Sequence, residues 1–436
     1  MVAKLIRIWL IAGVILVVAS GLAFSAGESE GAAGEAAPSA DGKTTIVYQN
    51  YHSAEAASRA VIEAMVELFE QEHPNIEVEL LPLPYEQTLQ QTVISASSGT
   101  MAYVVQLVPL WTPPLVELGA LEPLDSYFST SFFEEIPRAA YESGVIDGTT
   151  YTLPGLLNIV TVWAWKPLLE EAGLEPVVPD TWDEFKEASR KISELGADIY
   201  GFAARTNNTQ NSAFWMFPVI WGHGGQFVDD QGNIVLDQGT GYADALDWYH
   251  TIVATGQSPN SLGVREIRNV FVQGKIGFIF DVSTVPGIFR SISEQGEAID
   301  DDIIVGLLPE APDGNRYGIG NDNIYGIAAS SDSKQEAATF IEFMTSDPEA
   351  VRIYYERLGA FPTRKSLYDA PFYQSQPYFS EIAAMAEFAT SLPSKSTEFG
   401  NALDIMANAM QEAILGGDTI EISRETAEAV RDVYGE

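Results

Sequence analysis

The chain has 436 residues, of which 46% are hydrophobic and 11% aromatic, so it is long and apolar enough to fold into two globular lobes. Its 23 basic and 61 acidic residues give a net charge of −38, which argues against a nucleic-acid partner and weakly disfavours a strongly anionic ligand. Because there is no cysteine, the sequence excludes disulfides, thiolate metal sites and the lipid-anchored form of secretion.

The first 26 residues have the pattern of a signal peptide. Lys4 and Arg7 precede an apolar run, and small residues follow it at the spacing that signal peptidase accepts. We therefore expect a signal peptide over residues 1–26, a flexible linker over residues 27–43 and a periplasmic mature protein. An uncleaved membrane anchor is the alternative, because the apolar run approaches the length that spans a bilayer.

A strand, a helix and a second strand open the folded part of the sequence. Thr45–Gln49 is a β-branched run, and from Ser53 apolar residues recur on one helical face as far as His73. In Ile76–Leu80 apolar and acidic residues alternate, which is typical of a half-buried strand. This order predicts a βαβ unit with parallel strands, and hence an α/β fold.

The rest of the sequence continues the alternation without an internal repeat. Leu156–Trp165 is a long apolar segment that we expect to cross between two lobes. Further helices are expected over Tyr85–Ser97, Trp182–Leu195, Asn211–Trp221, Tyr242–Thr255, Lys334–Thr345, Pro348–Leu358, Phe399–Leu415 and Ser423–Val433. Further strands are expected over Val104–Val108, Tyr200–Ala204, Ile276–Phe280, Ile303–Leu307 and Ile324–Ala329, with a hairpin of Gln226–Val228 and Asn233–Leu236.

Eight segments, taken in order, resemble those of a known family. They are FEQEHPNIEVEL (Phe69–Leu80), GALEPLDSYF (Gly119–Phe128), DGTTYTLP (Asp147–Pro154), KPLLEEAGL (Lys166–Leu174), PDTWDEFKEA (Pro179–Ala188), GGQFVDDQGN (Gly224–Asn233), FVQGKIGFIFD (Phe271–Asp281) and FIEFMTSDPEA (Phe340–Ala350). The chain from about Thr44 onward is similar to the family 1 extracellular solute-binding proteins, which include the maltodextrin-binding and other sugar-binding receptors of ABC importers.

The resemblance implies a two-lobed, type II periplasmic-binding-protein fold of class α/β, with discontinuous lobes around a hinge and a central cleft. It places residues 44–150 plus 283–329 in lobe one and residues 151–282 plus 330–436 in lobe two. The implied function is that of a monomeric, non-enzymatic receptor without metal or cofactor. It would close on a small solute, with a mono- or oligosaccharide favoured, and deliver it to a membrane ABC permease.

Open α/β sheets bind ligands outside the carboxyl ends of their strands. Tyr51 and His52 follow the first expected strand, Trp111 follows the strand that begins at Val104, and Asp281 ends the Ile276–Phe280 strand. These four site candidates are therefore expected to line the cleft. Asp281 either accepts two sugar hydroxyls or caps the following turn.

Sugars stack their C–H faces on aromatic rings and bond their hydroxyls to planar polar groups. Trp163 and Trp215 join Trp111 as stacking candidates, although packing in the core explains each of them equally well. Asn158 is the strongly polar side chain of the Leu156–Val160 run, so it either faces the cleft or is bonded structurally.

The resemblance adds two further ligand contacts, Asn321 and Asp322. They lie in the glycine-rich segment Gly318–Asn323, which is expected to be a polar loop leading into a second hinge strand. A simple turn is the alternative for this segment.

Two other functions stay open at this point. A secreted glycoside hydrolase needs two carboxylates across a sugar cleft, and with 61 acidic residues the sequence neither supports nor excludes such a pair. GxSxG, Walker A and HExxH motifs are absent from the sequence. A non-sugar ligand is the second alternative: a polyamine would suit the acidic and aromatic composition, whereas a glycerophosphodiester would need clustered basic residues that the expected strand ends lack.

Overall fold

The computed structural model describes residues 42–229, 231–359, 361–390, 392–393 and 395–435. The expected signal peptide, the alternative membrane anchor and almost all of the expected linker lie outside the described residues. Within the described part, no helix is both long enough and apolar enough to cross a membrane.

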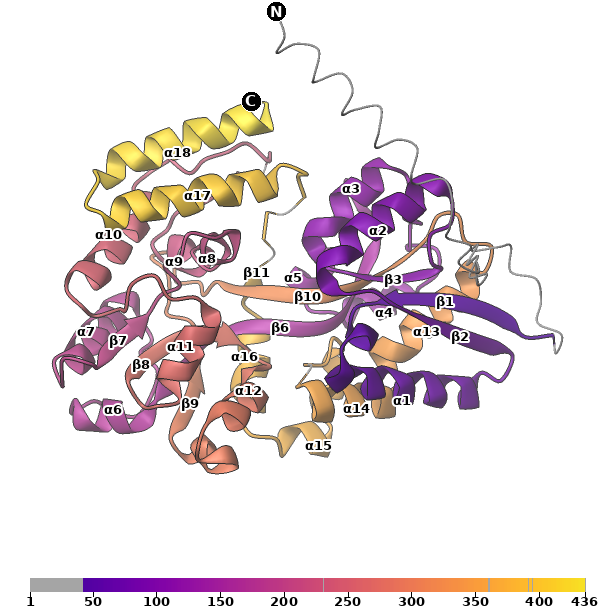
Figure 1. Ribbon diagram of the computed structural model, residues 1–436, viewed down its shortest axis with the longest axis horizontal. Coiled ribbons are helices and arrows are strands. Elements are labelled where there is room, and N and C mark those ends of the chain that lie inside the picture. The colour runs from indigo at the N-terminus through magenta and orange to yellow at the C-terminus, as the bar shows by residue number, and fades with distance from the viewer. Residues whose placement is uncertain (1–41, 230, 360, 391, 394, 436) are drawn as a thin grey trace, which may run out of the picture. The chain divides into compact units, whose positions relative to one another are not determined.

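One sheet, with strand order β2-β1-β3-β10-β6-β8-β7, forms the centre of the described fold (Figure 1). Its strands are β1 (Thr44–Asn50), β2 (Ile76–Pro82), β3 (Val104–Leu107), β6 (Thr152–Trp165), β7 (Tyr200–Ala203), β8 (Ile276–Val282) and β10 (Gly318–Ile327), with β9 (Ile303–Gly306) beside β6 and β11 (Ala389–Thr390) beside β10. A separate pair is formed by β4 (Val145–Ile146) and β5 (Thr149–Thr150).

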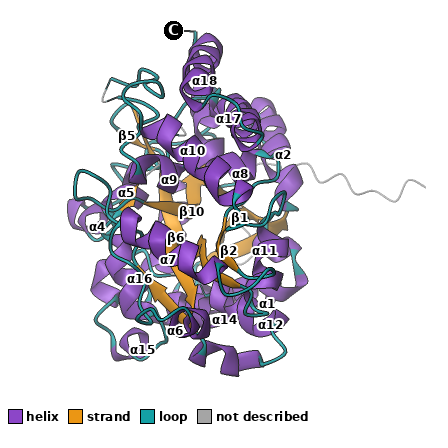
Figure 2. Cartoon of the chain, turned by 90° about the vertical axis from the view of Figure 1, so that its left-hand side faces the viewer, coloured by secondary structure: helices purple, strands orange, loops and turns teal. Residues whose placement is uncertain are grey.

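Helices surround the strands, as Figure 2 shows in purple around the orange sheet. In the first half of the chain they are α1 (Ala56–Glu72), α2 (Tyr85–Ser98), α3 (Thr112–Glu117), α4 (Thr130–Glu134), α5 (Arg138–Glu142), α6 (Lys166–Glu171), α7 (Trp182–Ser193), α8 (Gln210–Phe214) and α9 (Phe217–Gly222). In the second half they are α10 (Gly241–Ala254), α11 (Val264–Phe271), α12 (Val285–Ile292), α13 (Lys334–Ser346), α14 (Pro348–Leu358), α15 (Pro371–Gln374), α16 (Phe379–Ala386), α17 (Phe399–Ile414) and α18 (Thr419–Tyr434).

The predicted βαβ unit is confirmed. β1 and β2 pair in parallel with Thr44 opposite Ile76, and α1 connects them. In β2, Ile76 and Val78 are buried whereas Glu77 and Glu79 are exposed, as the alternation in the sequence predicts. The carboxyl ends of β1 and β3 therefore lie at the same edge of the sheet, because β3 also runs parallel to β1.

The strands β6 and β10 run between two groups of elements, one around β1–β3 and the other around β7–β9 (Figure 1). β6 pairs with β10 along its first part and with β8 and β9 along its second, so the expected crossing of Leu156–Trp165 is confirmed. The expectation of a loop at Gly318–Asn323 is wrong, because this segment belongs to β10 and pairs with β6. Its glycines and polar side chains suggested a turn, but the backbone bonds to β6 hold it extended.

Two local predictions need correction. The helix expected over Asn211–Trp221 is two short helices, α8 and α9, separated by Trp215 and Met216. The expected hairpin forms no regular strands among its described residues. It has one isolated bridge, between Val228 and Ile234, flanked by backbone bonds from Val235 to Phe227 and from Asp229 to Asn233. In both cases the apolar and turn signals identify the segment but not the break in its hydrogen bonding.

The division into lobes stays a prediction, and the packing favours a different assignment of two segments. α13 and α14 pack against α1, with the rings of Phe340 and Phe69 4.9 Å apart. In contrast, Phe289 of α12 contacts Trp163 of β6, and β9 pairs with the same end of β6. We propose that α13 and α14 belong to lobe one, and that α12 and β9 belong to lobe two.

A close approach between the crossing strands depends on Gly155 of β6. A Cβ atom at this position would lie 2.2 Å from the ring of Tyr325 in β10, and Tyr325 is fully buried. A side chain here would therefore push the two strands apart.

Gly155→Ala should lower the free energy of unfolding by about 1–3 kcal/mol, because the buried Tyr325 ring has no room to move aside. Gly287→Ala in α12 is the matched control, since a Cβ atom there meets nothing within 4 Å and alanine favours a helix. Urea denaturation of both variants measures the difference. Equal stability of the two variants would contradict the packing described for β6 and β10.

Candidate functional site

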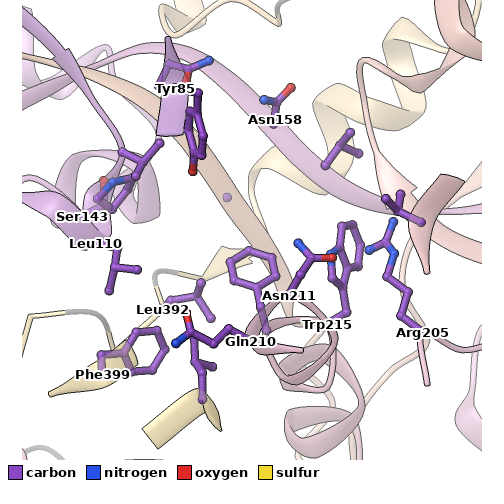
Figure 3. Close-up of a pocket in the computed structure, with 18 of the residues that line it drawn as sticks. Tyr85, Leu110, Ser143, Asn158, Arg205, Gln210, Asn211, Trp215, Leu392 and Phe399 are labelled. Carbon is purple, nitrogen blue, oxygen red and sulfur yellow. The ribbon is translucent and has the colours of Figure 1, made fainter. Parts of the chain in front are cut away.

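A pocket of about 510 Å³ lies where the two groups of elements meet (Figure 3). This volume is in the range of small-molecule sites, roughly 300–1,000 Å³. Its described lining consists of Tyr51, Tyr85, Val108, Pro109, Leu110, Ser143, Asn158, Arg205, Gln210, Asn211, Phe214, Trp215, Val264, Arg268, Val282, Gly320, Asn323, Leu392, Phe399 and Leu403.

Four strands bring their carboxyl ends to this pocket. Tyr51 follows β1, Val108 follows β3, Arg205 follows β7 after one further residue, and Val282 is the last residue of β8. The pocket therefore lies where the general rule for open α/β sheets places a ligand. α8 and the start of α17 form the opposite wall, in Figure 3 below Asn158 and to the left of Arg205.

The expected residues after β1 and β3 occupy different depths. Tyr51 lines the pocket and is 6% exposed. Trp111 is buried behind it, with ring centroids 6.5 Å from Tyr51 and 5.0 Å from Tyr85. Its neighbour Leu110 lines the pocket instead. Trp111 thus supports the orientation of two lining aromatic rings.

His52 is not among the lining residues. Its Nδ1 lies 2.5 Å from the hydroxyl of Tyr354 and 3.2 Å from Nε2 of Gln106, and its ring packs edge-on against Tyr51. Burial lowers the pKa of His52 to about 4, so the imidazole is neutral at physiological pH. Its contacts are those of a side chain that holds the base of the pocket in place.

Trp215 lines the pocket, and the guanidinium carbon of Arg205 lies 3.3 Å from its ring centroid. Trp163, in contrast, is fully buried between Phe289 and Tyr378, with ring centroids 5.8 Å and 5.2 Å away. Trp163 does not line the pocket and belongs to the core beneath it.

Asn158 of β6 lines the pocket, and its side chain is labelled at the top of Figure 3. Its Oδ1 is buried and accepts no hydrogen bond from any described residue. Its backbone pairs with Asn321 of β10, and Asp322 pairs with Leu157. The side chains of Asn321 and Asp322 lie outside the described part of the structure, but the adjacent Gly320 and Asn323 line the pocket.

Asp281 lies inside β8 rather than at its end, and its side chain is 1% exposed. Arg268 of α11 donates from Nε and Nη2 to its two carboxylate oxygens, both at 2.7 Å. The backbone N–H of Val282 donates to Oδ1 at 2.8 Å, and Nη2 of Arg205 lies 3.4 Å from the same oxygen. The carboxylate is thus occupied by protein donors, and it orients two arginines that line the pocket.

Most of the lining residues are not among those expected from the sequence. Arg205 could have been found with the strand-end rule, because it follows the expected strand Tyr200–Ala204 directly. Phe399 and Leu403 read as the apolar face of a helix, and nothing in their spacing separates a pocket wall from a core contact. Arg268 and Asn211 carry no local signal of this kind.

Among the described residues, no group of three or more histidine, aspartate or glutamate side chains is arranged to hold a metal ion. The described lining residues contain aromatic rings, side-chain amides and two arginines, but no carboxylate. Such a wall can bind a polar organic molecule by stacking and hydrogen bonding.

Comparison with known proteins relates this fold to one family. The model of the bacterial extracellular solute-binding proteins matches residues 52–351. A protein of Brucella abortus (strain 2308) that is named only as a binding protein is 27% identical over 362 residues, which are 81% of this chain and 84% of that protein. The maltotriose-binding protein of Pyrococcus abyssi is 21% identical over 356 residues, which are 80% of this chain and 73% of that protein.

A solved structure shows the same architecture. The sugar-binding protein MalE of Xanthomonas citri superposes with a TM-score of 0.80 at 21% identity, and the match covers 90% of this chain and 98% of that chain. The described part of the chain therefore has the two-lobed, type II periplasmic-binding-protein fold, as the sequence predicts.

Two buried histidines should make stability depend on pH. Burial lowers the pKa of both His52 and His223 from 6.5 to about 4, and Nε2 of His223 has no hydrogen-bond partner among the described residues. Between pH 6.5 and about pH 4, these two histidines are largely protonated in the unfolded chain but neutral in the folded chain. The free energy of unfolding should therefore fall as pH drops from 6.5 towards 4, by up to about 1.4 kcal/mol per pH unit for each histidine.

Urea titrations across this range, for the native chain and for the double variant His52→Gln/His223→Gln, isolate this effect from the titration of the many carboxylates. The double variant should lose less stability on acidification than the native chain. Parallel losses would show that the two imidazoles do not resist protonation in the folded state.

Proposed function

The chain belongs to the bacterial extracellular solute-binding protein family, and we propose that it captures a sugar in the pocket of Figure 3 and delivers it to an ABC importer. The observation that carries the proposal is the composition of the pocket wall. The aromatic rings of Tyr51, Tyr85 and Trp215 line the same pocket as the amides of Asn158 and Asn211. In Figure 3 the ring of Trp215 lies beside Asn211. Rings for C–H faces and amides for hydroxyls are the two kinds of partner that a sugar requires.

The proposed ligand contacts follow from the lining. Of the residues expected from the sequence, Tyr51, Asn158 and Trp215 line the pocket directly. We add Asn211 and Arg205 to these contacts, because both lie on the same wall as Trp215 (Figure 3).

Four other expected residues have a different proposed place, and the last two keep the place that was expected. We propose that Trp111, His52 and Asp281 position neighbouring lining residues, and that Trp163 packs in the core. Asn321 and Asp322 stay proposed ligand contacts. This proposal rests on the position of their backbone in β10, where they pair with Asn158 and Leu157 of β6.

The lining also supports binding by closure. Tyr51 and Leu110 come from the group around β1 and β3, whereas Arg205 and Trp215 come from the group around β7 and β8. A ligand that touches both groups stabilises the arrangement in which they are close, and so shifts the population towards a closed form. In this proposal the permease recognises that closed form.

Export and partnership belong to the same proposal. The family is extracellular, which agrees with the expected signal peptide over residues 1–26 and a periplasmic location. The proposed partners are the sugar and a membrane permease, and the receptor itself is a monomer. The names of the maltotriose-binding and sugar-binding relatives support a saccharide as the ligand.

We propose binding without turnover. A glycoside hydrolase places two carboxyl groups on either side of the scissile bond, roughly 5–10 Å apart. The described lining residues include no aspartate or glutamate, and Asp281 behind them is held by Arg268. A polyamine receptor is also disfavoured, because the charged side chains of the described lining are two arginines.

A thermal-shift screen of mono- and oligosaccharides tests the proposed function. A sugar at about 100 times its dissociation constant should stabilise the protein by roughly 2.7 kcal/mol. A shift produced by polyamines or glycerophosphodiesters and by no sugar would overturn the sugar assignment. Release of reducing ends from a bound oligosaccharide would show a hydrolase.

Asn211→Ala should weaken binding of the sugar found in the screen by roughly 2- to 10-fold, because one hydrogen bond to a hydroxyl is lost. Asn208→Ala is the matched control: Asn208 is also exposed, lies three residues earlier, bonds to Asn408 and does not line the pocket. Calorimetric titration measures both affinities. Equal affinities of the two variants would remove Asn211 from the site.

A further inference from the structure

The electrostatics of the pocket differ from those of the chain as a whole. Although the chain carries a net charge of −38, the charged side chains among the described lining residues are Arg205 and Arg268. Local charge, and not the net charge, determines which ligand a pocket prefers. The two arginines therefore bear on the class of sugar that this pocket takes.

Arg205 lies in the wall of the pocket although it is only 5% exposed. Its guanidinium lies over the ring of Trp215, with Cζ 3.3 Å from the ring centroid. Burial, the largest cause, lowers its pKa to about 10 against the opposite effect of Asp281, so the side chain is charged at neutral pH. Arg205 is therefore a buried cation that packs against the ring of Trp215.

The hydrogen-bonding capacity of Arg205 is largely unused within the protein. Nη2 faces Oδ1 of Asp281 at 3.4 Å, but no described residue accepts a hydrogen bond from Nε or Nη1, and both atoms are buried. Burying a charged group without partners is costly, so these donors favour a ligand that brings an acceptor.

Asp281 cannot satisfy both cations. Its two oxygens already receive Nε and Nη2 of Arg268 at 2.7 Å, together with the N–H of Val282. Among the described side chains, one carboxylate shared by two guanidinium groups leaves one positive charge beside the pocket. A single negative charge on the ligand would neutralise it.

Another buried arginine of the chain shows the contrast. Arg316 is 8% exposed and donates to Asp180 at 2.9 Å, to Glu310 at 3.1 Å and to the carbonyl of Leu308 at 2.7 Å. Arg316 therefore has two acidic partners of its own, whereas Arg205 has part of one. The positive charge of Arg205 is therefore only partly neutralised within the described structure, and Arg205 lines the pocket.

We propose that the pocket selects an acidic sugar, a saccharide with one carboxylate per binding site such as a uronic acid, and that Arg205 donates to this carboxylate from Nη1. The inference rests on the proposed function, because it names the class of sugar for the same pocket. A carboxylate fits better than a phosphate monoester, which carries about −1.5 to −2 at pH 7, since the described arginine pair and Asp281 together carry one excess positive charge.

Matched pairs of sugars that differ only in the carboxylate test this inference. We would titrate the protein with galacturonate and galactose, glucuronate and glucose, and mannuronate and mannose, and with dimers of each. At least one uronate should bind roughly 10- to 100-fold more tightly than its neutral partner. Its affinity should fall with rising salt, whereas that of the neutral sugar should not.

Variants connect the preference to one residue. Arg205→Met should abolish the preference, Arg205→Lys should reduce it because the planar donors are lost, and Arg316→Met is the control for removing a buried arginine elsewhere. The salt dependence of the native chain supplies a test that does not depend on these variants folding.

The outcomes separate this inference from the function on which it rests. Neutral sugars that bind as tightly as their uronates would overturn the acidic-sugar inference and leave the sugar receptor standing. A preference that persists in a folded Arg205→Met variant would overturn the role of Arg205. No response to any uronate would overturn the inference, and a response to sugar phosphates alone would replace the carboxylate by a phosphate.

Discussion

The antiparallel pairing of β6 with β10 is the constraint on which the pocket depends. The backbone ladder runs from Gly320 opposite Ile159 to Gly326 opposite Thr152, and beyond it β6 pairs with β8. Because a ladder of this kind fixes register, the strand ends of both groups face one shared volume. A pocket whose walls are joined through two long strands can also change width through small dihedral changes at a few residues, which is the basis of hinge closure.

A second constraint is the ion pairing around Asp281. Two arginines from different parts of the chain converge on this buried carboxylate. Arg205 follows β7, and Arg268 lies in α11. Removing a carboxylate from water is costly unless it is paired, so Asp281 draws both Arg268, at 2.7 Å, and Arg205, at 3.4 Å, to the same place. A strongly acidic chain thereby presents a locally positive pocket wall, and its composition alone does not reveal this.

Much of the fold follows from the sequence, and the site follows from it only in part. The alternation in Ile76–Leu80 predicts β2, and the apolar run Leu156–Trp165 predicts the crossing strand, because burial repeats with the period of the element. Strand ends correctly bring Tyr51 to the pocket. Trp163 shows the limit: an aromatic residue next to the site packs in the core, and only the three-dimensional contacts of its ring decide between the two. Gly318–Asn323 shows a second limit. Its composition predicts a loop, but backbone pairing with β6 makes it part of a strand.

In the proposed function, a sugar is held between the two groups of elements joined by β6 and β10. A crystal structure grown with the sugar that stabilises the protein most strongly tests it directly. The account predicts a sugar in contact with Tyr51 on one side and with Trp215 and Arg205 on the other, next to Asn158. A sugar bound at any other surface, with these four side chains untouched, would contradict it.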